Sequence, residues 1–200
     1  MNAVSDHIKV EVTNGLEQPG SRSEKAPMRG AIHVGLLTGG SDKTYAYGLT
    51  DALVAQGVRV DFIGSDELDS PHLHQCDLIN FLNLRGDQDN EAGMAKKVVR
   101  VITYYARLVR YAAVARPRIF HILWNNKFEL IDRTILMAFY KLLGKKIAFT
   151  AHNVNAGKRD SNDGWTNRFS LAFQYRIADH IFVHTHLMKD ELIEIGRAHV

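Results

Sequence analysis

Residues 31–40 read AIHVGLLTGG, an apolar run that ends in a pair of glycines. The next residues, 43–56, carry tyrosine and leucine at helical spacing and stop at Gly57. Residues 58–63 then form a second apolar run. This order of strand, glycine turn, helix and strand is typical of two parallel strands that are joined by a crossover helix.

The same alternation extends along the rest of the chain. We expect further strands at 77–82, 118–123, 145–150 and 179–184, and helices at 91–115, 128–143, 165–178 and from 187 onward. These strands are short and largely apolar, as is usual when helices cover both faces of a parallel sheet. The sequence therefore predicts an α/β fold, with a doubly wound parallel sheet of about six strands.

The composition excludes several classes of protein. With 46% hydrophobic and 24% charged residues in a length of 200, the chain has the balance of a globular domain. No run approaches the roughly 20 apolar residues of a membrane span, and the N-terminus lacks the apolar core of a signal peptide, so we expect a cytoplasmic protein. The net charge of +3 is too small to indicate nucleic acid. The single cysteine, Cys76, cannot form an internal disulfide.

We expect one folded domain, at residues 28–194. Residues 1–27 are polar and hold several prolines, glycines and serines, which predicts a flexible tail, although the alternation of Val10 and Val12 is also compatible with a short strand. Met1 and Met28 are both possible starts. Residues 195–200 read IGRAHV, which matches the translation of a common short-read sequencing adapter. We therefore expect a non-native tail there, and a chain that is a fragment.

Candidate ligand-binding residues follow the predicted strands, because ligands of doubly wound sheets bind where the strands end. Gly39 and Gly40 follow the first strand, where backbone N–H groups can approach an anion at the start of a helix. Trp124 and Asn125 end the strand at 118–123 and offer an aromatic ring and an amide to a sugar. A plain tight turn and a half-buried tryptophan are the alternatives. Neither the dinucleotide G-x-G-x-x-G motif nor a Walker A sequence occurs.

Two further strand ends carry histidines. His152 follows the strand at 145–150 and can bind a hydroxyl or exchange a proton, or it can pack locally. His184 ends the last strand and forms a His-x-His pair with His186, but no zinc-site spacing is completed, so we predict no metal. The loop after His152 adds hydroxyl- and phosphate-binding side chains, namely Asn153, Asn155, Lys158 and Arg159.

The predicted helix at 91–115 is amphipathic. One stripe is basic and consists of Lys96, Arg100, Arg107 and Arg110. The opposite arc, which we expect to face the core, holds Val98, Val101, Ile102, Tyr105, Leu108, Val109 and Ala112. The basic stripe is either a solvated face or a surface that is attracted to an anionic membrane. The second interpretation would place the protein peripherally on the inner face of the membrane.

Two longer segments resemble a known family. Residues 150–155 read TAHNVN and residues 174–185 read QYRIADHIFVHT. Together with the glycine pair, they are similar to the N-terminal half of glycosyltransferase family 4 enzymes, over residues 30–194. The resemblance implies a Rossmann-like domain of the two-domain GT-B fold. It also implies hexosyl transfer from a nucleotide-sugar donor to a glycan or lipid-linked acceptor, with retention at the anomeric carbon, as in polysaccharide biosynthesis. No metal and no cofactor besides the nucleotide-sugar is implied.

The resemblance also implies roles for individual residues. His152 would contact the donor sugar and the reacting centre. Gly39 and Gly40 would lie against the donor phosphates or the acceptor. The residues near the acceptor would be Asn153, Lys158 and Arg159.

Two features of that family are missing from the sequence. No two glutamates lie eight positions apart, so the Glu-x7-Glu motif is absent, and no second α/β domain follows. We therefore expect the acceptor-side domain of a glycosyltransferase, inactive by itself. The alternative is a non-catalytic α/β module that binds a small anion or a nucleotide through Gly39 and Gly40.

Overall fold

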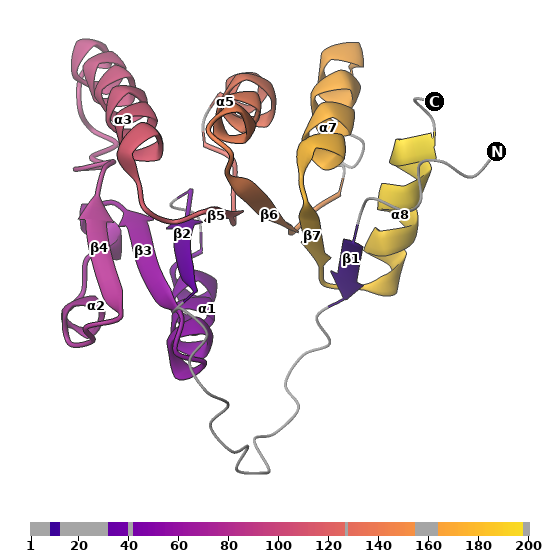
Figure 1. The fold of residues 1–200 in the computed structure, drawn as a ribbon. Coiled ribbons are helices and arrows are strands. Elements are labelled where there is room, and N and C mark those ends of the chain that lie inside the picture. Colours follow the sequence, from indigo (N-terminus) through magenta and orange to yellow (C-terminus); the bar gives the residue numbers. More distant parts are fainter. Residues whose placement is uncertain (1–8, 13–31, 40–41, 127, 155–163, 198–200) are drawn as a thin grey trace.

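A parallel β-sheet organises the chain. The computed structural model describes residues 9–12, 32–39, 42–126, 128–154 and 164–197 (Figure 1). Seven strands form one sheet in the order β1-β7-β6-β5-β2-β3-β4, and every neighbouring pair is parallel. The strands are β1 (Lys9–Val12), β2 (His33–Leu37), β3 (Arg59–Gly64), β4 (Ile79–Asn83), β5 (Ile119–Ile122), β6 (Lys146–Ala151) and β7 (His180–Val183). The predicted doubly wound parallel sheet is confirmed.

Strand β1 adds one strand to the predicted sheet. It pairs with β7 in a register that runs from Lys9 opposite His180 to Val12 opposite Val183. Residues 9–12 therefore belong to the sheet and not to the flexible tail that the sequence predicts for 1–27, because their alternating valines suit an edge strand. The rest of residues 1–27, and residues 198–200 of the expected C-terminal tail, lie outside the described residues.

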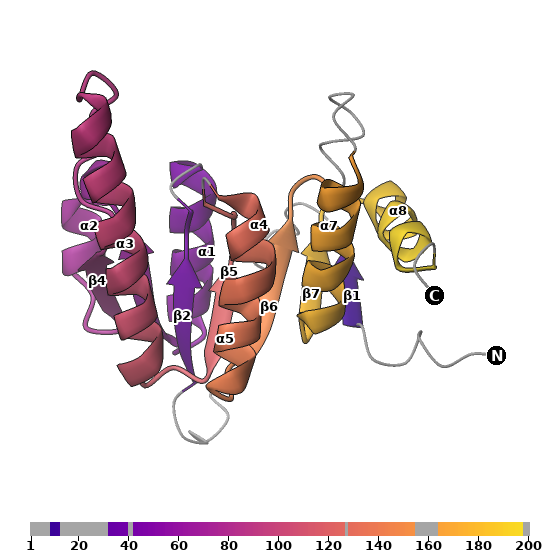
Figure 2. The same cartoon turned by 90° about the horizontal axis from the view of Figure 1, so that it is seen from above.

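Helices cover both faces of the sheet. Figures 1 and 2 show α3, α5 and α7 on one face and α1 and α2 on the other, while α8 packs beside β1 and β7. The helical segments are α1 (Lys43–Ala55), η1 (Asp66–Leu68), α2 (Pro71–His74), α3 (Met94–Val114), α4 (Glu129–Ile131), η2 (Asp132–Leu136), α5 (Met137–Leu142), α7 (Trp165–Ile177) and α8 (His186–Arg197).

Each face of the sheet has its own apolar core. Under α3, α5 and α7, the fully buried side chains include Leu108, Phe120 and Met137. Under α1 and α2 they include Phe62 and Leu73. Each such side chain stabilises the fold by about 1.5–3 kcal/mol relative to an exposed one. The two cores therefore hold the sheet as a rigid platform for the loops at its edges.

Helix α3 buries only part of the predicted arc, including Leu108 and Ala112. Its buried residues, Tyr104, Leu108 and Ala112, lie four positions apart on one stripe. The expected core residues Val98, Ile102 and Val109 are 50%, 64% and 39% exposed, so that part of the prediction is wrong. The physical reason lies with Tyr104, whose ring and hydroxyl both find partners beneath the helix and turn this stripe inward.

The segment at 174–185 contains a structural carboxylate, Asp179. Asp179 accepts hydrogen bonds from the backbone N–H of Ile147 at 2.8 Å and from Lys141 Nζ at 2.7 Å. Burial raises the pKa of Asp179, but these bonds and a third one from Lys146 outweigh it, so the net pKa is lowered. Asp179 therefore fastens the start of β7 to β6. His184 follows directly at the end of β7.

A buried histidine lies in the middle of the sheet. His121 on β5 is 7% exposed, and its Nε2 lies 2.8 Å from Thr150 Oγ1 on β6. Its ring stacks on Phe182 of β7 with the centroids 5.3 Å apart. Burial and, to a smaller extent, positive charge on His180 or His152 lower the pKa of His121 to about 4. The imidazole is therefore neutral at neutral pH.

The neutral His121 predicts a loss of stability in acid. Between pH 4 and 6.5 the unfolded chain binds more protons at this residue than the folded chain does, so the free energy of unfolding must fall as the pH falls through this range. We expect His121 to contribute up to about 3 kcal/mol to this loss. Urea unfolding at neutral pH and at about pH 4.5 measures it. The variant His121→Gln, which keeps a polar partner for Thr150, should show a flatter pH profile; an unchanged profile would contradict the assignment.

Candidate active site

The site lies where the direction of the sheet reverses. From β2 the chain continues to β3 on one side, whereas β5 lies on the other side of β2 and leads on to β6. Ligands of doubly wound sheets bind in the crevice at the carboxyl ends of these two strands. Gly39 follows β2 there and Trp124 follows β5, and the N–H of Leu123 donates to Leu37 O at 2.9 Å. The topology thus brings together two of the predicted residues.

Gly39 touches the backbone of Trp124. Its φ of +63° lies in the left-handed region, and a Cβ placed on it would lie 2.6 Å from both Cβ and O of Trp124. No side chain fits in that space. Beyond this turn, Asp42 caps helix α1 by accepting a hydrogen bond from the N–H of Tyr45 at 2.9 Å. The glycine is therefore required by the close approach of two strand ends.

Aromatic rings enclose His152 at the end of β6. Its imidazole stacks on the Trp124 indole with a centroid distance of 4.1 Å and an interplanar angle of 3°. Tyr45, from the first turn of α1, meets the edges of three rings, those of His152, Trp124 and His184, at 4.9–5.7 Å. One face of the indole is thus occupied by His152. The sequence gives Tyr45 only as a helix position, and its role depends on the direction in which α1 leaves the glycine turn.

A hydrogen bond links the two strand-end histidines. His184 Nε2 lies 3.0 Å from His152 Nδ1. When His152 Nδ1 accepts this bond, Nε2 of the neutral ring carries the proton and donates; when Nδ1 donates, Nε2 accepts. His152 Nε2 is buried and has no hydrogen-bond partner within the part of the chain that the structure describes. The pair therefore fixes the ring and leaves one hydrogen-bonding function unused.

The surroundings keep His152 uncharged. Burial and, to a smaller extent, the neighbouring His184 lower the pKa of His152 to about 4, against the opposing effect of Asp42. At neutral pH the ring can thus offer a hydrogen bond to a hydroxyl or take up a proton. It carries no permanent charge for an ion pair.

Asn125 lies in a different environment from the one expected. Its side-chain amide pairs reciprocally with Gln174 of α7: Gln174 Nε2 donates to Asn125 Oδ1 at 2.8 Å, and Asn125 Nδ2 donates back at 3.3 Å. Gln174 is 1% exposed. In this arrangement the Asn125 amide joins the end of β5 to α7.

The next residue, Asn126, is the second amide that the sequence places at this strand end, and it is the centre of a polar network that the sequence did not predict. Asn126 Oδ1 accepts from Tyr104 OH at 2.7 Å and from Arg85 Nη1 at 3.0 Å, and its Nδ2 donates to Asp132 at 3.1 Å. Arg85 also donates to Gly39 O, which ties the network to the glycine turn. Burial raises the pKa of Tyr104 to about 12, so its hydroxyl remains a donor.

A π-helical turn delivers Asp132 to this network. Segment η2 interrupts the helix between α4 and α5, and such turns frequently mark functional sites. Asp132 is 5% exposed and also accepts from Tyr105 OH at 3.0 Å. Burial raises the pKa of Asp132 against the effect of these hydrogen bonds. No local sequence signal indicates a π-helical turn, so this connection could not be predicted.

Several predicted site residues cannot be placed. Gly40, Asn155, Lys158 and Arg159 lie outside the described residues. Asn153 is exposed next to His152. Among the described residues, no group of three histidine, cysteine or acidic side chains could hold a metal ion.

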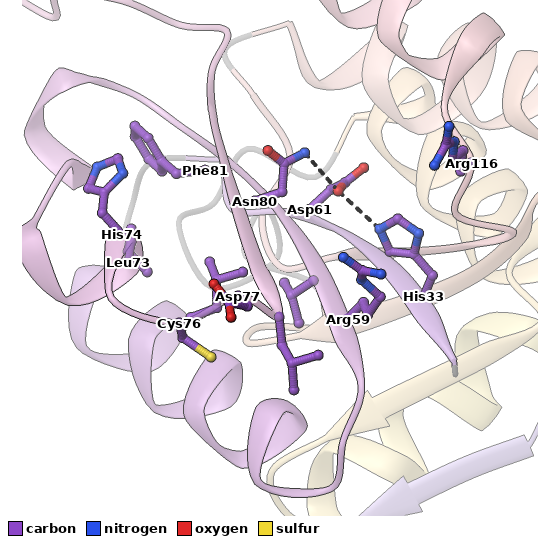
Figure 3. Close-up of a pocket in the computed structure, with 13 residues that line it drawn as sticks. His33, Arg59, Asp61, Leu73, His74, Cys76, Asp77, Asn80, Phe81 and Arg116 are labelled. Carbon is purple, nitrogen blue, oxygen red and sulfur yellow. Dashed lines mark hydrogen bonds and ion pairs between the residues drawn. The ribbon is translucent and has the colours of Figure 1, made fainter. Parts of the chain in front are cut away.

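A cavity lies at the opposite edge of the sheet, where the strands begin. It has a volume of about 720 Å³ and opens beside the amino ends of β2, β3 and β4 (Figure 3). Its central carboxylate, Asp61, already accepts hydrogen bonds from His33, Asn80 and Tyr111 at 2.9–3.0 Å. Because internal donors satisfy this group and the strands end elsewhere, we place the active site at the carboxyl edge.

Comparison with known proteins identifies the family of the chain. The family model described as Glycosyltransferase Family 4 matches residues 43–200, which is well over half of the chain. Searches of curated proteins and of solved structures gave no match. The match includes Trp124, His152 and His184, and it agrees with the Rossmann-like sheet. The chain belongs to glycosyltransferase family 4.

Proposed function

We propose that this domain forms the acceptor-side wall of the active site of a retaining glycosyltransferase. The enzyme would move a hexosyl group from a nucleotide-sugar to a glycan or lipid-linked acceptor, without a metal ion. One observation carries the proposal: a neutral, immobilised His152 lies beside a glycine turn at the point where the sheet reverses direction.

The unused nitrogen of His152 supports a role in binding a hydroxyl. A buried polar atom without a partner costs roughly 1–3 kcal/mol, and a substrate hydroxyl that reached Nε2 would remove this cost. The stack on Trp124 and the bond to His184 restrict the ring to one orientation, so little entropy is lost when the hydroxyl binds. We assign to His152 the orientation of the transferred sugar at the reacting centre.

The remaining predicted residues take supporting roles in this proposal. Gly39 and Gly40 would lie against the donor phosphates or the acceptor, and the loop with Asn153 would face the acceptor. The loop members outside the described residues, Asn155, Lys158 and Arg159, keep their expected places on the acceptor side.

We also propose contact with an anionic membrane surface through α3, in the cytoplasm. None of the described helices is long and apolar enough to cross a membrane. Helix α3 instead exposes apolar side chains, among them Val98 and Ile102, beside the exposed Arg107 and Arg110. A helix that exposes both apolar and basic side chains in this way is suited to lie in the plane of a lipid surface. Lys96 and Arg100, the other members of the basic stripe, are engaged by the 86–92 loop.

Replacing His152 tests the enzymatic proposal. With the protein encoded by the complete gene, we expect His152→Ala to lower turnover of a nucleotide-sugar by about a hundredfold, because the sugar loses its orientation. Turnover is measured as the release of nucleoside diphosphate from a panel of nucleotide-sugars. This assay does not require that the acceptor be known. The matched control is His74→Ala, which removes an exposed histidine at the far edge of the sheet and should leave turnover unchanged. Equal turnover in both variants would remove His152 from the active site, and no turnover of any nucleotide-sugar by the unmodified protein would favour a non-catalytic module.

Replacing the exposed arginines of α3 tests the membrane proposal. We expect Arg107→Gln with Arg110→Gln to weaken binding to phosphatidylserine vesicles by about fivefold per arginine, mainly at low salt. Vesicle co-sedimentation measures the effect. The control pair, Arg116→Gln with Arg118→Gln, removes the same charge near the amino ends of the strands. A similar loss in both pairs would indicate a response to net charge and not a binding face.

A further inference from the structure

A second cavity lies beside the active site at the carboxyl edge of the sheet. It has a volume of about 280 Å³ and lies between the segment that follows β4 and the first half of α3. It shares Asn126 and Arg85 with the network behind the glycine turn. Its polar lining includes Arg85, Lys97, Arg100, Tyr104, Tyr105 and Asn126.

The lining is positively charged and has no matching carboxylate. Arg85, Lys97 and Arg100 all contribute, and among the described residues none of them forms an ion pair. Their hydrogen-bond partners are neutral oxygens: Lys97 donates to Asn90 O at 2.7 Å, and Arg100 donates to Asp87 O at 3.0 Å. Clustered cations without a counter-charge attract an anion.

The nearby carboxylates are directed elsewhere. The Asp87 carboxylate pairs with Lys96 at 3.3 Å, on the outer side of α3. Asp132 lies behind the cavity, where Tyr105 and Asn126 occupy one of its oxygens. Asp132 still attracts Arg85 and Asp87 still attracts Arg100, so they offset part of the positive charge, but neither carboxylate lines the cavity.

The donors of the cavity are held in place before any ligand arrives. Arg85 lies over the ring of Tyr104, with its guanidinium carbon 5.1 Å from the ring centroid, and two hydrogen bonds from Nη1 fix it further. Arg100 is held by the carbonyl oxygens of Asp87 and Asp89. Preorganised guanidinium groups bind phosphate oxygens strongly, often through two parallel bonds.

We propose that this cavity binds the phosphate or diphosphate group of the acceptor substrate. The volume suits a small group and not a whole nucleotide. Arg85 connects the cavity to the Gly39 turn, so an anion held here would lie next to the proposed site of sugar transfer.

Val101 lines the cavity, and the apolar side chains of Val98 and Ile102 lie on the adjoining arc of α3. An acceptor with an apolar chain attached to its phosphate fits this arrangement. The identification of the anion as an acceptor rests on the proposed function.

Binding measurements on the present chain test the cavity without requiring sugar transfer. Isothermal titration with inorganic pyrophosphate and with geranyl diphosphate should show saturable binding. Lys97→Gln with Arg100→Gln should weaken it by at least roughly tenfold, because two charge-assisted contacts are lost. The matched control, Arg116→Gln with Arg118→Gln, removes the same charge at exposed positions outside the cavity, and should change the affinity by less than about twofold. An equal loss in both pairs, or no saturable binding, would overturn the proposal.

Two further measurements determine where the anion binds and whether it belongs to the acceptor or the donor. The methyl resonances of Val101 should shift when pyrophosphate binds to the unmodified chain, and those of Val114 at the far end of α3 should not. This result decides the location even if the Lys97 and Arg100 variant fails to fold; binding without a shift at Val101 would overturn the proposal.

If uridine diphosphate binds much more tightly than geranyl diphosphate and displaces it, the anion belongs to the donor and the assignment to the acceptor is wrong. If diphosphate binds here but no nucleotide-sugar is turned over, the anion site stands and the proposed function fails.

Discussion

The close approach of Gly39 to Trp124 determines the geometry of everything at the carboxyl edge of the sheet. Because no side chain separates the two backbones, the end of β2 lies directly against the end of β5. That contact sets the position of the Trp124 indole, and the indole in turn supports the imidazole of His152. It also brings Gly39 O within reach of Arg85. A wider gap at this point would separate the aromatic cluster from the basic cavity.

Two different electrostatic environments adjoin this contact. On one side, aromatic rings and a second histidine favour the neutral form of His152. On the other, cations gather around a cavity whose polar wall is made of donors that are already oriented. A substrate with a hydroxyl-rich part and an anionic part could use both sides at once. Asn126 connects the two sides, because it accepts a hydrogen bond from Tyr104 of α3 and donates one to Asp132 of the helix that follows β5.

The sequence predicts the strands and part of the site because both depend on local patterns. Short apolar runs give the strands, and the carboxyl ends of parallel strands meet at one edge, so Gly39, Trp124, His152 and His184 could be grouped without coordinates. The role of Tyr45 depends on the angle at which α1 leaves the turn, and no local pattern reveals it. The network around Asn126 joins residues that are far apart in sequence, through an irregular helix. Apolar periodicity predicted Leu108 and Ala112 correctly as inward residues of α3, but it also placed Val98, Ile102 and Val109 there, because it could not show that the hydrogen-bonded Tyr104 faces the sheet.

The π-helical turn at 132–136 has a consequence for the lengths of chain that this family member can tolerate. A π turn accommodates one residue more than an α-helical turn. Loss of a single residue from 132–136 would let the helix close into regular α geometry while the segments on either side keep their relative orientation, because the π turn holds the extra residue locally. Met137 and Tyr140 are both buried and would keep their packing, so the change would be confined to the turn that holds Asp132. The extra residue therefore affects how Asp132 is presented to Asn126 and not how α5 packs.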